Sequence, residues 1–77
     1  MTFRDKHALE TLPGRMEVLQ KEIDAHRAAL AEPGLYQKNP GKFDVSAKAL
    51  EESEAALATA EERWLELEMK REELESQ

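Results

Sequence analysis

The sequence predicts an all-α fold, an antiparallel two-helix coiled-coil hairpin with a short N-terminal helical segment packed on its base. Two series of apolar residues recur at the heptad spacing with which one helix packs against another. A break rich in proline and glycine, residues 32–41, separates the two series, and folding back there lets them bury each other. The first series is Leu9, Leu12, Met16, Leu19, Ile23, His26 and Leu30, and the second is Leu50, Leu57, Ala60, Trp64, Leu67 and Leu74.

The first helix is expected over residues 3–31, with a kink near residues 12–13. Proline inside a helix removes a backbone hydrogen bond and clashes with the preceding turn, so Pro13 favours a change of direction. Thr11 is the expected cap of the segment that follows the kink. We expect Phe3 to dock the short first segment on the far end of the second helix, near residues 67–70.

The turn is expected over residues 32–39, because Pro33 and Gly34 end the first helix. Asn39 followed by Pro40 is the pattern of a cap residue and a first helical residue, so the second helix is predicted over residues 40–75. With the centre of the turn near residues 36–37, the numbers of facing residues sum to about 73. This register places Leu12 opposite Ala60.

Length and composition argue against an enzyme. A chain of 77 residues forms one domain, residues 1–77, and two packed helices enclose no core large enough for a substrate. The sequence has no phosphate-binding glycine loop, no nucleophile elbow and no cysteine. His7 and His26 are too far apart in sequence for a typical two-histidine metal site. We therefore expect no catalytic residue, no metal and no bound cofactor.

Charge is distributed unevenly along a chain whose net charge is −6. Residues 51–77 are strongly acidic, whereas residues 31–50 hold three lysines and two acids. The candidate residues for nucleic-acid contact are Tyr36, Lys38, Lys42 and Lys48, since lysines near an aromatic ring suit phosphates and bases. The alternatives are a merely solvated tip, and an aromatic-apolar pair, Leu35 and Tyr36, that covers the open end of the seam.

The sequence gives no sign of a membrane or secreted protein. No apolar run approaches the eighteen or so residues that span a bilayer, and the N-terminus lacks the apolar core of a signal peptide. Absence of cysteine is compatible with any compartment and most natural in a reducing one. We expect a cytoplasmic protein that contacts no membrane.

Five segments together resemble the carboxy-terminal coiled-coil domain of Uup-type ABC-F ATPases, the ABC transporter C-terminal domain family. The resemblance covers nearly the whole chain, and the turn and the tryptophan segment make it specific. Glu32 and Asn39 stand where aspartate is commoner in the family. The segments are Phe3-Arg4-Asp5-Lys6, Leu9-Glu10-x-Leu12-Pro13, Leu30-Ala31-Glu32-Pro33-Gly34-Leu35-Tyr36, Asn39-Pro40 and Glu61-Glu62-Arg63-Trp64-Leu65-Glu66-Leu67-Glu68.

This resemblance implies a non-catalytic accessory domain, the C-terminal fragment of a larger ATPase with two ATP-binding cassettes. ATP and magnesium would belong to those cassettes and not to this chain. The resemblance further implies a ribosome-associated parent, with DNA or ribosomal RNA and the cassettes of the parent chain as partners. We take contact with nucleic acid through the tip of the hairpin as the leading hypothesis, with the chain as a monomer.

The alternative is a structural coiled coil that binds a partner protein or forms a homodimer without nucleic acid. Apolar residues left outside the two seams, such as Val18, Leu65 and Met69, would then form the contact.

Overall fold

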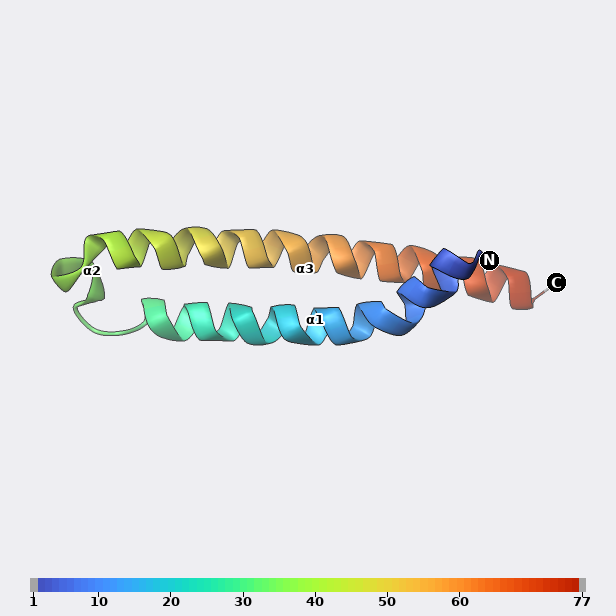
Figure 1. Ribbon diagram of the computed structural model, residues 1–77, viewed down its shortest axis with the longest axis horizontal. Helices are drawn as coiled ribbons and strands as arrows, with labels where there is room; N and C mark the ends of the chain where they lie inside the picture. The colour runs from blue at the N-terminus through green and yellow to red at the C-terminus, as the bar shows by residue number, and fades with distance from the viewer. Residues whose placement is uncertain (1, 77) are drawn as a thin grey trace.

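The computed structural model describes residues 2–76, which form a rod of 60 × 15 × 14 Å. Helix α1 spans Phe3–Leu30, the single-turn helix α2 spans Leu35–Lys38, and helix α3 spans Pro40–Glu75. Helices α1 and α3 lie side by side and run in opposite directions, with α2 at the end where the chain turns back (Figure 1). The hairpin predicted from the two apolar seams is confirmed. We call the end at α2 the tip and the end holding both chain termini the base.

Helix α1 runs without interruption through Pro13. Its cap is Thr2, whose hydroxyl accepts a hydrogen bond from the Asp5 amide at 3.2 Å. The expectation that Thr11 caps a second segment is wrong, because no helix begins there and the Thr11 hydroxyl donates to the Ala8 carbonyl at 3.4 Å. The first turns of α1 are nonetheless inclined to the rest of the helix and cross α3 (Figure 1). A proline is a common cause of such a bend.

The core is the seam between α1 and α3. Leu19 and Ile23 from α1 are buried against α3, where Ala60 and Leu67 are buried. Ser53 is also buried, one heptad before Ala60. Small residues at these two positions let the helices approach closely, so the larger side chains of α1 find room opposite them.

The two predicted seams agree with burial except at one end. Every member of the first seam and the second seam up to Leu67 is buried or half-buried, Trp64 included. Leu74 is 44% exposed and lies outside the seam. Leu12 and Ala60, which the expected register places opposite each other, line the same shallow groove between the helices.

None of the helices in residues 2–76 combines the length and the hydropathy that crossing a membrane requires.

Candidate functional site

The tip of the hairpin is shaped by Gly34 and Leu35. Gly34 has a φ of +77°, which a residue with a side chain adopts only under strain, and it caps α2. The Lys38 amide closes the turn by donating to the Gly34 carbonyl at 2.9 Å. This turn buries Leu35, which is 7% exposed. The burial of Leu35 agrees with one half of the alternative reading, which placed Leu35 and Tyr36 together over the open end of the seam.

Tyr36 behaves differently from its neighbour. Its ring meets the Phe43 ring edge to face, with centroids 5.3 Å apart and planes at 83°, yet Tyr36 stays 62% exposed. The contact with Phe43 thus holds the Tyr36 ring on one side, and most of the residue faces solvent. Tyr36 is available for contact with a partner, whereas Leu35 is not.

The three candidate lysines are all exposed but do not form one group. Lys38 ends α2, and Lys42 lies in the first turn of α3, where its amide donates to the capping Asn39 side chain at 3.0 Å. Lys48 follows six residues later on α3, and at 3.6 residues per turn this spacing turns it about 120° away from Lys42. The structure brings Lys38 and Lys42 to the tip, and it places Lys48 on another side of α3.

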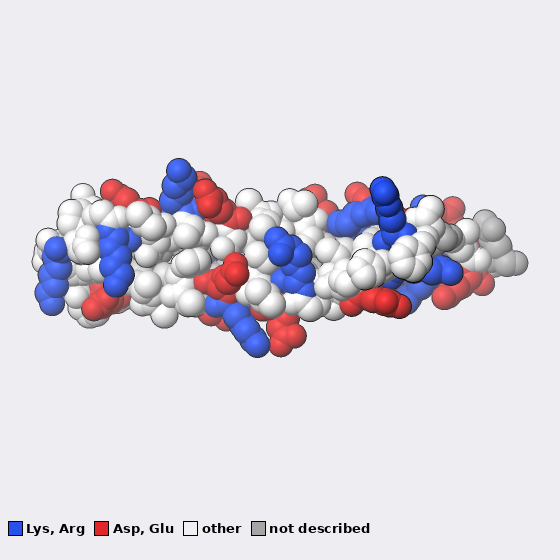
Figure 2. Space-filling model, viewed as in Figure 1, with Lys and Arg blue, Asp and Glu red and all other residues white. Residues whose placement is uncertain are grey.

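The tip lysines have no acidic partner among residues 2–76. The ion pairs of this part of the chain lie on α1 and toward the base, and none includes Lys38, Lys42 or Lys48. Basic side chains stand out at the tip end of the rod in Figure 2. Lysine is a flexible point charge that suits phosphate contact without fixing one geometry. This arrangement favours attraction to a polyanion more than recognition of one sequence.

At the base, Asp5 forms a junction that the sequence interpretation missed. Asp5 is 7% exposed and accepts from Arg63 at 3.1 Å and from Lys70 at 2.9 Å, two residues of α3. The hydrogen bond from Lys70 and the charges of Lys70 and Arg63 lower the pKa of Asp5, outweighing the effect of its burial. A hydrogen bond between the Asp5 carboxylate and the backbone of Thr2 lowers this pKa further. These bonds fix the first turns of α1 across α3.

The expected role of Phe3 at the base is wrong. Phe3 is 83% exposed and does not dock on residues 67–70, because Asp5 faces α3 in its place. The sequence contained a signal for this position. The alternating spacing of three and four residues in the first seam, continued backward from Leu12 and Leu9, reaches Asp5. Its charge argued against a seam position, and the two cations that compensate it lie far away in sequence.

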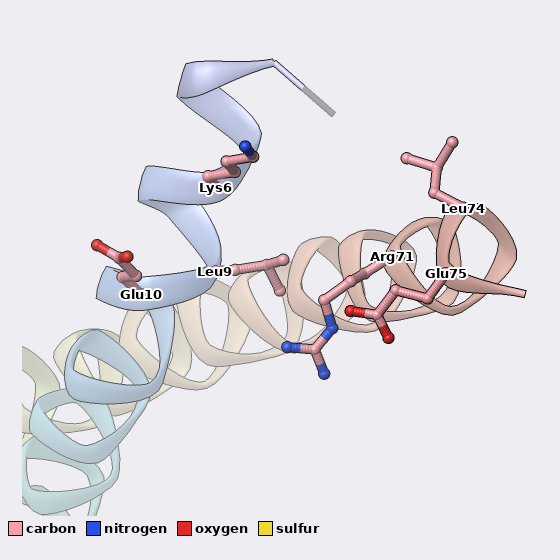
Figure 3. Close-up of a pocket in the computed structure, with 6 residues that line it drawn as sticks. All are labelled: Lys6, Leu9, Glu10, Arg71, Leu74 and Glu75. Atoms are coloured by element: carbon pink, nitrogen blue, oxygen red, sulfur yellow. The ribbon is translucent and has the colours of Figure 1, made fainter.

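An open cavity of about 430 Å³ lies at the base, where the first turns of α1 diverge from the last turns of α3 (Figure 3). Two leucines give it apolar walls, and two basic and two acidic side chains surround them. Such a mixed, open groove holds no nucleophile and no convergent acid-base pair. Within residues 2–76 no group of three histidine or acidic side chains is arranged to hold a metal ion. The lining residues are Lys6, Leu9, Glu10, Arg71, Leu74 and Glu75.

Comparison with known proteins places most of the hairpin in one family. The family described as ABC transporter C-terminal domain matches residues 1–69. Two proteins of Haemophilus influenzae, named ATP-binding protein Uup-like and ATP-binding protein Uup, are each 37% identical over 71 residues, 92% of this chain. The chain spans only 16% and 11% of their respective lengths. No solved structure matches the chain. The match over the seam, the turn and the tryptophan segment shows that this chain belongs to the ABC transporter C-terminal domain family.

Proposed function

We propose that this chain is a non-catalytic accessory domain of an ABC-F type ATP-binding protein and contacts nucleic acid, DNA or ribosomal RNA, through the tip. ATP and magnesium belong, in this proposal, to the cassettes of the parent protein. The observation that carries the proposal is the pair Lys38 and Lys42, exposed at the end of a rod beside the exposed ring of Tyr36. A rod of 60 Å separates this end from the base, so the tip can reach a surface away from the parent.

The distribution of charge along the rod explains why the tip, and not the sides of the helices, would contact nucleic acid. The net charge of −6 repels phosphates at long range, and most of the acids lie in residues 51–77. At physiological salt this repulsion is screened beyond roughly 8 Å, a small part of the length of the rod. Phosphates that approach the tip then experience the nearby lysines more than the distant glutamates.

The test is a salt titration of binding to a labelled DNA duplex and to a ribosomal RNA fragment. Replacing Lys38 and Lys42 together by Glu is expected to abolish most of the binding. The milder pair Lys38→Gln and Lys42→Gln should reduce the slope of log K against log salt by about 1.8 for duplex DNA, at 0.9 per phosphate contact. Lys48→Glu, measured alone, shows whether the third lysine takes part.

A matched control separates local contact from net charge. Lys21 and Arg27 are exposed cations on α1, and replacing both by Glu changes the net charge by the same amount as the tip pair. The proposal expects this control to lower affinity much less than the tip variant. Equal losses would show that only overall charge matters, and the tip proposal would then be wrong.

A second candidate function is a protein contact without nucleic acid. Leu65 and Met69 lie one turn apart on α3 and are 54% and 60% exposed, and Val18 on α1 is 54% exposed. Exposed apolar neighbours of this kind favour a homodimer or a partner helix. Light scattering over a range of concentrations separates the two candidates. A stable dimer that ignores nucleic acid would support this function and refute the tip proposal, whereas a monomer that binds nucleic acid would do the opposite.

A further inference from the structure

The side of α3 that faces away from α1 carries an apolar ridge near the base. Leu65 and Met69 lie one turn apart and are 54% and 60% exposed, whereas Leu67 between them is buried in the seam at 1% exposed. At 3.6 residues per turn, a step of two residues rotates the chain by about 200°. Leu65 and Met69 are therefore both turned about 160° away from Leu67, one on each side, and together form the ridge.

Acidic side chains bracket the ridge at both ends. Two glutamates lie one turn before Leu65, and two lie one turn after Met69. All four are exposed, and none belongs to an ion pair within residues 2–76. We call the ridge together with these glutamates the outer face. The four glutamates are Glu61, Glu62, Glu72 and Glu73.

The basic residues of this end of α3 are turned away from the outer face. Residues 51–77 hold three cations, Arg63, Lys70 and Arg71. All three lie within about 60° of Leu67 around α3. Arg63 and Lys70 bind Asp5 of α1 at 3.1 Å and 2.9 Å, and Arg71 pairs with a glutamate three residues earlier. The junction at Asp5 thus holds two cations on the seam side and leaves the outer face acidic throughout.

We propose that the outer face binds a basic amphipathic helix of a partner protein. The apolar stripe of that helix packs on Leu65 and Met69, and its lysines or arginines pair with the four glutamates. Methionine suits such a contact, because its flexible thioether side chain adapts to the surface it meets. This inference goes beyond both candidate functions, since it fixes the chemistry of a partner and holds whether or not the tip contacts nucleic acid.

Charge selects this occupant over the others. A second copy of the chain would bring the same four glutamates against these in a twofold contact, where like charges repel. Anionic lipid headgroups and phosphates would meet the same repulsion. An apolar helix without cations would cover the ridge but would leave the glutamates desolvated and without partners. A basic helix matches both the ridge and the charges around it.

Fluorescence anisotropy of a labelled peptide with the full 77-residue chain measures this contact. The probe is a peptide of about fourteen residues, built of leucine and lysine with the leucines at helical spacing. Replacing Leu65 and Met69 by Ala should weaken its binding at least about tenfold. The matched control replaces Val18 and Val45, which are 54% and 69% exposed elsewhere, by Ala and should stay within about twofold. Melting curves followed by circular dichroism should be the same for all these chains.

The role of charge is tested by replacing the four glutamates of the outer face with Gln. This variant should bind the peptide at least about fivefold more weakly at low salt, and added salt should then have little further effect. A peptide with glutamate in place of lysine should not bind the unchanged chain. The matched control neutralises four exposed acids elsewhere and should lose less than about twofold. These control acids are Glu10, Glu22, Asp24 and Glu32.

The tip proposal and this one fail separately. Replacing Lys38 and Lys42 by Glu tests the tip with duplex DNA and should leave peptide binding within about twofold.

Three results would overturn the inference: no binding of the lysine peptide, binding that survives replacement of Leu65 and Met69, or equal losses from the outer-face variants and their matched controls. A dimer that is lost when Leu65 and Met69 become Ala would also overturn it. That result would assign the outer face to a second copy and would still support a protein contact.

Discussion

A pair of leucines two positions apart on α3 tests whether the seam holds the hairpin together. Leu67 is 1% exposed and Leu65 is 54% exposed. Both become Ala in the experiment, so the change in helix propensity is the same at the two positions. Only burial differs between them, and any difference in the free energy of unfolding therefore measures the packing of the seam.

The expected difference is a large part of the total stability. Truncating a buried leucine costs about 2–5 kcal/mol, whereas an exposed substitution stays within about 0.5 kcal/mol. At 0.05–0.15 kcal/mol per residue, a domain of this length has about 4–12 kcal/mol in all. Leu67→Ala is expected to remove between about a sixth of this free energy and all of it, so a chain at the lower bound of stability unfolds if the loss is near 5 kcal/mol.

Urea unfolding followed by far-ultraviolet circular dichroism measures this difference. With a slope of about 1 kcal/mol/M, typical of small domains, Leu67→Ala should lower the midpoint by at least about 2 M. Leu67→Met keeps most of the volume and should cost less than about 1.5 kcal/mol, which keeps one variant measurable if Leu67→Ala does not fold. Equal losses from Leu65→Ala and Leu67→Ala would refute the packing described here.

Three further predictions concern the junction at the base, two glycines and the cap of α3. Asp5→Asn should destabilise the hairpin near neutral pH, and the difference in stability from the unchanged chain should shrink as the pH falls below about 4. The pKa of Asp5 is lowered in the folded state, so the Asp5 carboxylate stabilises the fold at pH values above its ordinary pKa of 3.8. This stabilisation is lost when the carboxylate is protonated. Thermal unfolding at a series of pH values checks this, and a difference independent of pH would contradict it. Gly14→Ala should stabilise α1 by about 0.5–1 kcal/mol, because a β-carbon at this position meets nothing within 4 Å. Gly34→Ala should destabilise the hairpin by about 1–2 kcal/mol, because alanine adopts the positive φ of Gly34 only under strain. Chemical unfolding compares the two, and the same sign for both would be inconsistent with the described turn. Asn39→Ala should cost about 0.5–2 kcal/mol through loss of the cap bond to Lys42, while Asn39→Asp should cost little; equal losses would rule out that cap.

The hairpin was predictable because its two causes are local in sequence. Heptad spacing can be read along one helix at a time, and Pro33 with Gly34 marks the turn between the two series. Burial of Leu19, Ile23 and Ala60 follows from that spacing. The geometry of a coiled coil then leaves few alternatives for the fold.

The base was not predictable in the same way, because its contacts join residues far apart in sequence. Asp5 reaches Arg63 and Lys70, and a charged residue at a seam position appears unfavourable until both cations are in place. Phe3 appeared suited to docking by its apolarity alone. In the structure the charged Asp5 is buried and the apolar Phe3 is exposed, the reverse of what was expected.

The candidate residues of the tip were only partly specified by the sequence. A count of lysines groups Lys38, Lys42 and Lys48, but helical periodicity separates Lys48 from Lys42 on a helix that begins at Pro40, as the sequence had predicted. Likewise Leu35 and Tyr36 are neighbours in sequence and differ in exposure, because the turn that begins at Gly34 directs them differently. Their function stays a prediction.

Small-angle scattering of the chain in solution tests the folding back of α1 on α3 most directly. The hairpin predicts a largest dimension near 60 Å, a radius of gyration near 17.3 Å before the hydration layer is added, and a forward intensity that corresponds to 8.8 kDa. A single unbroken helix over the same residues would be about 110 Å long, at 1.5 Å per residue. A largest dimension near that value would contradict the hairpin, and with it the separation of tip and base.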